Sequence, residues 1–270
     1  MKNQIALSSG SLYTYGLNRF FEIAKKSGYS QIEICPDSRF DTQDPVYIKK
    51  LAKQNKVKII GLHYMMEFFG VWGDHKSRIE KSIDLAKKLK AKYLVIHSWE
   101  YSDPKYDSWI LKNQKRIIRE AKPVEVVFEN STKSYDMEKP DKPRTNRFEA
   151  KEMKKFDSVL MDTSHVGTAK SDLIDFFDTL ADKVKYIHFS DNNPKLHKDR
   201  PNSLEDRHLA PGKGKLPLEK FLRHLKKSGY KGIISIELIP DSIEAEKGEK
   251  MAIKNLQKAR EFVGKYFIQE

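Results

Sequence analysis

The chain has 270 residues and a formal net charge of +13. A chain this long can bury roughly 70–75% of its unfolded surface, so its core needs no disulfide or metal support. The single Cys35 excludes an internal disulfide framework and a cysteine-ligated zinc site. The absence of a long apolar run and of a secretory signal predicts a soluble, cytoplasmic protein with no membrane partner.

The positive charge is compatible with an anionic partner such as nucleic acid or a phosphorylated metabolite. Lysine-rich surfaces are also typical of thermophilic proteins, so the charge alone selects neither explanation. Basic residues are spread along the chain without a basic tail. If DNA is the partner, we expect the charge to gather around the mouth of the site.

Short apolar runs rich in β-branched and aromatic residues alternate with amphipathic segments, a pattern typical of buried parallel strands connected by helices. In chain order, the predicted elements are strand 4–7, helix 17–27, strand 31–35, strand 57–63, helix 76–90, strand 93–97, strand 124–129, strand 158–162, strand 184–189, helix 218–227, strand 232–238 and a last helix from about 243 to 266.

Eight strands in about 250 residues predict an α/β fold of the (β/α)8 TIM-barrel type, with residues 1–270 forming a single domain. The alternative is a doubly wound open sheet, which usually carries a glycine-rich phosphate turn after its first strand. The first turn, SSGSLYTYG, lacks that motif, which favours the barrel. The polar segment 132–147 is predicted to be a long loop on the face where barrel active sites lie.

Six successive predicted strands carry an imidazole or a carboxylate at or near their carboxyl ends. These residues are His63, His97, Glu129, Asp162, His188 and Glu237. In a barrel they would converge at the C-terminal mouth. Buried carboxylates cost free energy unless they are paired, and a divalent cation would attract all six side chains.

Three further candidates lie in the loops that follow. His165 comes three residues after Asp162, and Asp206 and His208 precede the Ala-Pro-Gly-Lys-Gly segment. Nine candidates exceed the four or five ligands that one zinc ion accepts, so two or three ions are expected. Histidine and carboxylate ligands suit Zn²⁺, with Mn²⁺ or another divalent cation as the alternative. The other histidines, His75, His197 and His224, are expected at the surface.

The fragments VFEN, MDTSH, IHFSDNN, DRHLAPGKG and SIEL resemble the xylose isomerase-like barrel superfamily, which includes endonuclease IV and many sugar isomerases and epimerases. Glu129, Asp162, His188 and Glu237 match positions that are common to the superfamily. The remaining five candidates complete a set that resembles the trinuclear zinc site of endonuclease IV.

This resemblance implies a division of the ligands among three ions. His63 and His97 would hold the first zinc, with Glu129 bridging to the second. Asp162, His188 and Glu237 would complete the second ion, and the third would be held by His165, Asp206 and His208.

The first functional hypothesis is hydrolysis of a DNA phosphodiester at apurinic or apyrimidinic sites. A zinc cluster would supply a hydroxide at neutral pH and stabilise the leaving oxygen, with Glu129 and Glu237 as the catalytic carboxylates. Opening the duplex requires wedge residues. The candidate DNA contacts are Arg39, Tyr64, Phe68 and Trp72.

The alternative is isomerisation or epimerisation of a sugar or sugar phosphate. One metal would polarise the substrate while Glu129 and Glu237 transfer a proton at carbon, and Arg207 or Lys213 would bind a phosphate. The segment GYSQIEI resembles the isomerase branch, and the loop after His63 departs from the expected wedge pattern. A catalytically silent metal-binding barrel is a third possibility, and the oligomeric state stays open.

Overall fold

The computed structural model describes residues 4–66, 73–100, 103, 105–135, 141–198 and 202–267. Eight parallel strands close into a barrel in the order β1 to β8, with β8 hydrogen-bonded to β1. The strands are β1 Ile5–Ser8, β2 Gln31–Ile34, β3 Lys58–His63, β4 Tyr93–His97, β5 Glu125–Glu129, β6 Val159–Asp162, β7 Val184–Phe189 and β8 Ile233–Ile236. The predicted (β/α)8 fold is therefore confirmed, with strand ends shifted by one or two residues.

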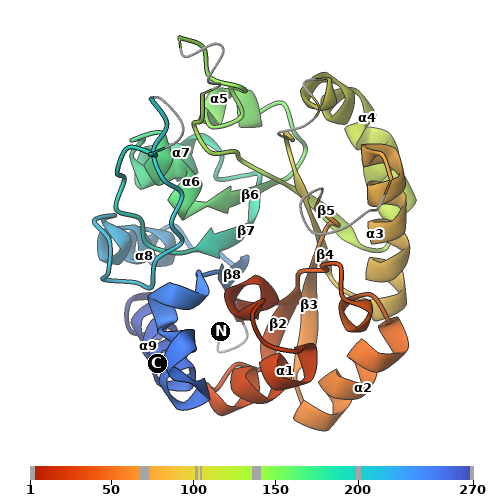
Figure 1. Cartoon of the computed structure of the whole chain (residues 1–270). Coiled ribbons are helices and arrows are strands. Elements are labelled where there is room, and N and C mark those ends of the chain that lie inside the picture. Colours follow the sequence, from red (N-terminus) through yellow and green to blue (C-terminus); the bar gives the residue numbers. More distant parts are fainter. Residues whose placement is uncertain are drawn as a thin grey trace.

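Helices surround the strands (Figure 1). They are α1 Leu17–Lys26, α2 Pro45–Asn55, α3 His75–Leu89, α4 Tyr106–Ala121, α5 Ala150–Met153, α6 Thr163–Thr168, α7 Leu173–Thr179, α8 Leu218–Lys227 and α9 Glu249–Phe267. The expected start of the last helix near residue 243 is wrong. Residues Pro240–Ile243 and Ala245–Lys247 form separate 3-10 turns, because Glu244 between them adopts a left-handed conformation with φ of 56°.

The barrel interior is divided into an apolar layer and a polar layer. The apolar layer is Ala6, Ile60, Tyr93, Val95, Val127, Leu160, Tyr186 and Ile233. Inward-facing side chains recur every second residue along a barrel strand. The next inward positions towards the carboxyl ends are therefore polar, as in His97 after Val95 and Glu129 after Val127. A separate apolar core fills the space between the strands and the helices.

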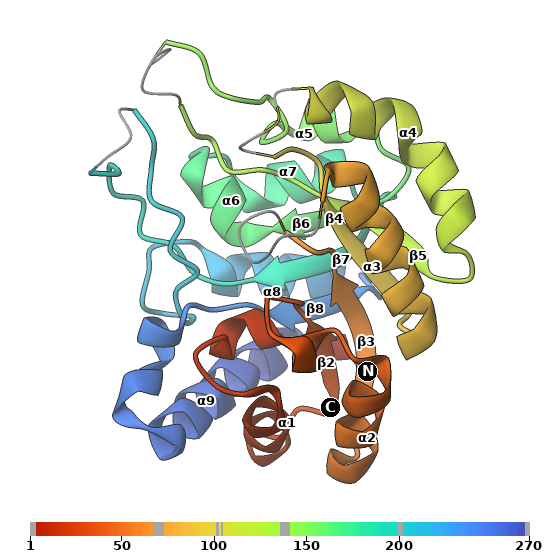
Figure 2. The ribbon, with the colours of Figure 1, turned by 45° about the vertical axis from the view of Figure 1, so that its right-hand side comes forward.

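Two long loops stand above the C-terminal end of the barrel. Figure 2 shows the loops after β5 and β7 projecting on the same side of the molecule. They are in contact, because the backbone N–H of Tyr135 donates to Ser203 Oγ at 2.8 Å. The loop predicted at residues 132–147 thus helps to form the wall above the barrel mouth.

Basic side chains are present at the opposite, N-terminal end of the barrel. The last turns of α1, α2, α3, α4 and α8 carry lysine or arginine, where the helix dipole favours cations. Exposed lysines also occupy the connections that lead into the strands, namely Lys56, Lys90, Lys122, Lys154 and Lys231. The loops after β5 and β7 at the mouth carry further exposed basic residues, namely Lys142, Arg144, Lys195, Lys198, Lys213 and Lys215. The positive charge is therefore confined to neither end.

A membrane span is not found in the part of the chain that the structure describes, where every helix is too short or too polar to cross a bilayer.

Candidate metal centre

The nine side chains that we expected to bind metal lie together at the C-terminal mouth. Eight of them, all except Asp206, form three groups, each with ligand atoms within 4.8 Å of one another. The first group is His63, His97 and Glu129; the central group is Glu129, Asp162, His188 and Glu237; the third group is Asp162, His165 and His208. Glu129 and Asp162 each belong to two groups, so the groups are contiguous.

The first group is centred on one oxygen of Glu129. Its Oε2 atom lies 3.5 Å from Nε2 of His63 and 3.3 Å from Nε2 of His97. His63 Nδ1 lies 3.0 Å from the Tyr64 carbonyl oxygen, which can only accept a hydrogen bond. The proton therefore resides on Nδ1, and the lone pair of Nε2 is available to a metal ion.

The central group surrounds His188, which is fully buried on β7. Its Nδ1 atom lies 2.8 Å from Glu237 Oε2, 3.2 Å from Glu129 Oε1 and 3.8 Å from Asp162 Oδ2. Glu129 thus directs one oxygen into the first group and the other into this one. Glu237 lies one residue beyond β8, and Ser8 on β1 donates to its Oε1 atom at 3.3 Å.

The third group combines the start of α6 with the loop after β7. Asp162 caps α6 by accepting the His165 N–H on Oδ1 at 2.9 Å, which leaves Oδ2 directed towards His208 Nδ1 at 3.8 Å. His165 Nδ1 donates to the Asn130 carbonyl at 2.7 Å. Asp206 Oδ2 lies 3.1 Å from Nε2 of both histidines, so it adjoins this group as well.

Electrostatic interactions inside the mouth shift several pKa values. Burial opposes ionisation of Glu129, but the nearby charges of His188 and His97 outweigh it and hold the pKa well below the ordinary range. Burial also opposes the charge on His188, whereas Glu237, Glu33 and Glu129 raise its pKa well above normal. For His208, Asp206 and Asp162 overcome burial and raise the pKa to about 10.

The residues present fit divalent cations. Glu129 Oε2 and Asp162 Oδ2 are buried carboxylate oxygens without a hydrogen-bond partner, which is costly unless another group compensates them. Ligand atoms that share one tetrahedral zinc ion at about 2.1 Å lie roughly 3.4 Å apart, close to the separations in the first group. Histidine nitrogens and carboxylate oxygens suit zinc and manganese.

One buried carboxylate near the metal centre was missed by the sequence analysis. Glu33 on β2 is completely buried, and its two carboxylate oxygens lie 3.1 and 3.2 Å from His188 Nε2. The alternation of strand 31–35 carried the signal, because a charged residue stands at an inward position between Ile32 and Ile34. Glu33 stands in the middle of the predicted strand, whereas the site residues were expected at the strand ends.

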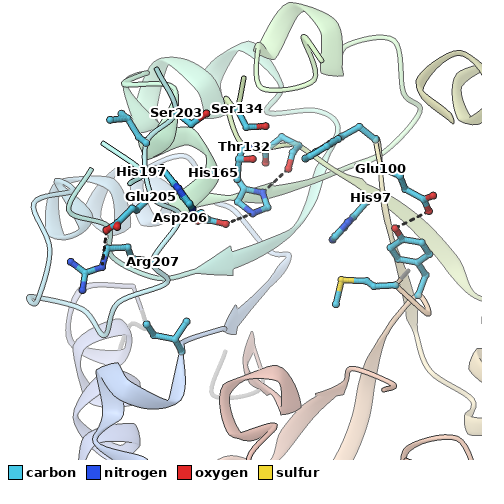
Figure 3. Close-up of a pocket in the computed structure, with 16 residues that line it drawn as sticks. His97, Glu100, Thr132, Ser134, His165, His197, Ser203, Glu205, Asp206 and Arg207 are labelled. Atoms are coloured by element: carbon cyan, nitrogen blue, oxygen red, sulfur yellow. Dashed lines mark hydrogen bonds and ion pairs between the residues drawn. The ribbon is translucent and has the colours of Figure 1, made fainter. Parts of the chain in front are cut away.

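Two pockets adjoin the metal centre. A pocket of about 300 Å³ opens directly onto Glu129, His208 and Glu237. A neighbouring pocket of about 550 Å³ has His165 and Asp206 on one wall, with His97 and Glu100 on the other (Figure 3). These volumes can accommodate a small ligand or part of a larger one.

Some of the expected substrate contacts lie in these pockets. Tyr64 lines the larger pocket and donates from its hydroxyl to Glu100 Oε1 at 3.1 Å. Arg207 also lines it and lies 3.7 Å from Glu205. His197, which we expected at the surface, is half-buried and belongs to the same wall because the loop after β7 folds over the mouth.

The other expected contacts are placed elsewhere. Arg39 donates through Nε to both carboxylate oxygens of Asp37, at 2.9 and 2.8 Å, and so stabilises the loop after β2. Lys213 is exposed, and its charge acts on Glu244. Phe68 and Trp72 lie outside the described residues, so their role as wedges stays a prediction.

Comparison with known proteins identifies the family. A family model described as xylose isomerase-like TIM barrel matches residues 21–262. The chain belongs to this family. An uncharacterized protein of Mycobacterium tuberculosis is 24% identical over 280 residues, covering 95% of this chain and 96% of the relative.

Solved structures with two different activities share the fold. D-psicose 3-epimerase from Clostridium cellulolyticum is 17% identical with a TM-score of 0.69, covering 97% of this chain and 99% of the epimerase. An AP endonuclease of family 2 from Brucella melitensis is 15% identical with a TM-score of 0.66, covering 88% of this chain and 93% of the endonuclease. At these identities the likeness concerns the fold alone.

Proposed function

We propose that the chain is a metal-dependent phosphodiester hydrolase that resembles endonuclease IV and cleaves DNA at apurinic or apyrimidinic sites. The observation that carries the proposal is the set of three contiguous ligand groups, which share Glu129 and Asp162. Adjacent metal sites of this kind suit phosphoester hydrolysis, in which the attacking and the leaving oxygen are both stabilised.

The size of the ligand set supports this reaction over proton transfer at carbon. A single metal in the central group would suffice to polarise a sugar carbonyl. In that case His63, His97 and His165 would have no evident chemical task. Yet Nδ1 of His63 and of His165 is hydrogen-bonded to a carbonyl oxygen, which leaves the Nε2 lone pair of each ring for a metal ion, and His97 Nε2 lies beside the shared Glu129. Four buried or half-buried histidines outside the central group therefore favour the hydrolase.

Two or three zinc ions are the proposed cofactor, and bound ions would supply Lewis-acid activation of the phosphoester and of the attacking water. The residues of the chain would hold and orient the reactants. Glu129 at the end of β5 and Glu237 after β8 both belong to the central group and would position the water. Tyr64 and Arg207, in the wall of the larger pocket, would contact the substrate.

A sugar or sugar-phosphate epimerase is the second candidate, favoured by a specific observation. The pocket over Glu129 and Glu237 measures about 300 Å³, the size of a small-molecule site. In this reaction Glu129 and Glu237 would exchange a proton with the substrate carbon, and the central group would hold one ion.

Nicking of a duplex that contains one abasic site tests the proposal. Zinc-loaded protein should cut the strand at the abasic position and leave the undamaged duplex intact. The Glu237→Gln variant, prepared in the same way, is the control for contaminating nucleases and should lose at least about 100-fold in rate, because a catalytic carboxylate is removed.

The same preparations are assayed with ketoses and ketose phosphates. Nicking that persists in Glu237→Gln, or turnover of a ketose without nicking by the wild type, would reject the DNA hydrolase and leave the epimerase.

A further inference from the structure

Glu33 and His188 form a buried pair that crosses the polar layer of the barrel. Glu33 extends from β2, and His188 extends from β7 on the other side. Both side chains are fully buried. Each oxygen of Glu33 lies within 3.2 Å of His188 Nε2, whereas Nδ1 of the same ring faces the central group.

We propose that Glu33 is a positioning residue that fixes the tautomer and orientation of His188 and thereby sets the metal affinity of the central group. This inference requires a metal ion in the central group, which both candidate reactions use, and it does not depend on DNA as the substrate.

The hydrogen-bonding capacity of the two groups supports this role. An ionised carboxylate can only accept, so the ring nitrogen facing Glu33 must carry a proton. In a neutral imidazole the other nitrogen, Nδ1, then holds the lone pair and can bind an ion between Glu129, Asp162 and Glu237. A carboxylate on the far side of a metal-binding histidine also increases the basicity of the ring.

A glycine on the adjacent strand leaves space for this pair inside the barrel. Gly61 on β3 stands opposite Glu33 in the strand register. A Cβ atom at Gly61 would lie 2.8 Å from Tyr186 Oη and 3.2 Å from both Cγ and Oε2 of Glu33. A larger residue would therefore press on Tyr186 and on Glu33, so Gly61 leaves the space that the carboxylate occupies beside His188.

The Glu33→Gln variant tests the inference at constant side-chain size. Its amide can donate to Nε2, which would move the ring proton to Nδ1 and block the metal. We expect the central ion to be bound about 10–100-fold more weakly, so that one ion fewer is retained per chain in a zinc-buffered chelator. Ile32→Val, on the same strand, is the matched control for a general loosening of β2 and should retain all ions.

A second measurement covers the case in which Glu33→Gln does not fold. In zinc-loaded wild-type protein labelled with ¹⁵N-histidine, NMR should find the His188 proton on Nε2 and the metal on Nδ1. The opposite tautomer would overturn the inference.

The remaining outcomes separate this inference from the proposed function. Equal ion retention by Glu33→Gln and wild type, or equal losses in Glu33→Gln and Ile32→Val, would reject the role of Glu33. A wild-type protein that binds no ion would reject both proposals. Weaker ion binding by Glu33→Gln in a protein that never nicks DNA would support Glu33 and reject only the hydrolase.

Discussion

Glu129 directs its two carboxylate oxygens in different directions. Oε2 faces the two histidines of the first group, and Oε1 faces His188 in the central group. The sequence placed Glu129 at the end of a strand, but only the resemblance to endonuclease IV suggested that it bridges two ions. The geometry agrees with that suggestion and makes the two neighbouring sites dependent on one side chain.

His208 is the residue that best separates the two candidate reactions. It belongs to the third group and is absent from the central group, so an epimerase with one ion does not need it. In a three-ion hydrolase, His208→Ala should remove one zinc per chain and slow nicking at least about 100-fold, since a lost metal contact costs several kcal/mol in the transition state. Metal analysis and the nicking rate measure the two effects.

His224→Ala is the matched control, because His224 lies on α8 and pairs with Asp178 at the surface. It should change neither quantity. An unchanged zinc content in His208→Ala would contradict the assignment of this residue to a third site.

At the scale of elements, the loop after β7 depends on one buried carboxylate. Asp191 accepts four backbone N–H groups, from Asn192 and Leu216 on Oδ1 and from Gly212 and Gly214 on Oδ2, at 2.9 to 3.0 Å. A Cβ at Gly214 would lie only 2.3 Å from this carboxylate. The loop that carries Asp206 and His208 is thereby folded around Asp191.

Asp191→Asn should therefore weaken both the fold and the third metal site. The amide keeps one acceptor oxygen, so two of the four buried N–H groups lose their partner, at a cost of about 1–3 kcal/mol. Urea unfolding should detect this loss, and zinc titration should show weaker binding of one ion.

Asp172→Ala is the control for the loss of a carboxylate outside this loop, because Asp172 caps the start of α7. It should lower stability without affecting zinc. Normal zinc affinity in Asp191→Asn would indicate that the ligands hold their positions without this anchor.

The elements differ in how far the sequence could predict them. The strands were predictable because each is a short, strongly apolar run, and their polar ends followed directly from the barrel geometry. Glu33 was missed because it lies inside a strand, and its importance depends on His188, which is more than 150 residues away in the chain. The placement of Arg39 could not be inferred, because the conformation of the loop after β2 turns its side chain to the neighbouring Asp37 and to the distant Tyr15 carbonyl.

At the scale of the whole molecule, the polar layer should make stability depend on metal. It concentrates buried carboxylates and imidazoles that bound cations would compensate, and a ligand that binds only the folded state stabilises it. Free zinc at about 100 times its dissociation constant adds about 2.7 kcal/mol per site, which corresponds to a rise in melting temperature of roughly 5 °C for a chain of this size.

Calorimetry of EDTA-treated protein before and after zinc addition measures this rise, with a non-coordinating salt at equal ionic strength as the control. Equal melting temperatures in both samples would argue against a metal centre linked to folding.

That residues 1–270 form one domain stays a prediction. A single cooperative unfolding transition in the same calorimetry experiment would support it.

Lysines are present at both ends of the barrel. They stand in the last turns of the helices at the N-terminal end, and exposed lysines such as Lys195 and Lys213 lie in the loop after β7 beside the mouth. A negatively charged solid support would consequently meet basic side chains at either end. An immobilised preparation would then hold the molecule in more than one orientation, with the mouth accessible to substrate in only part of it.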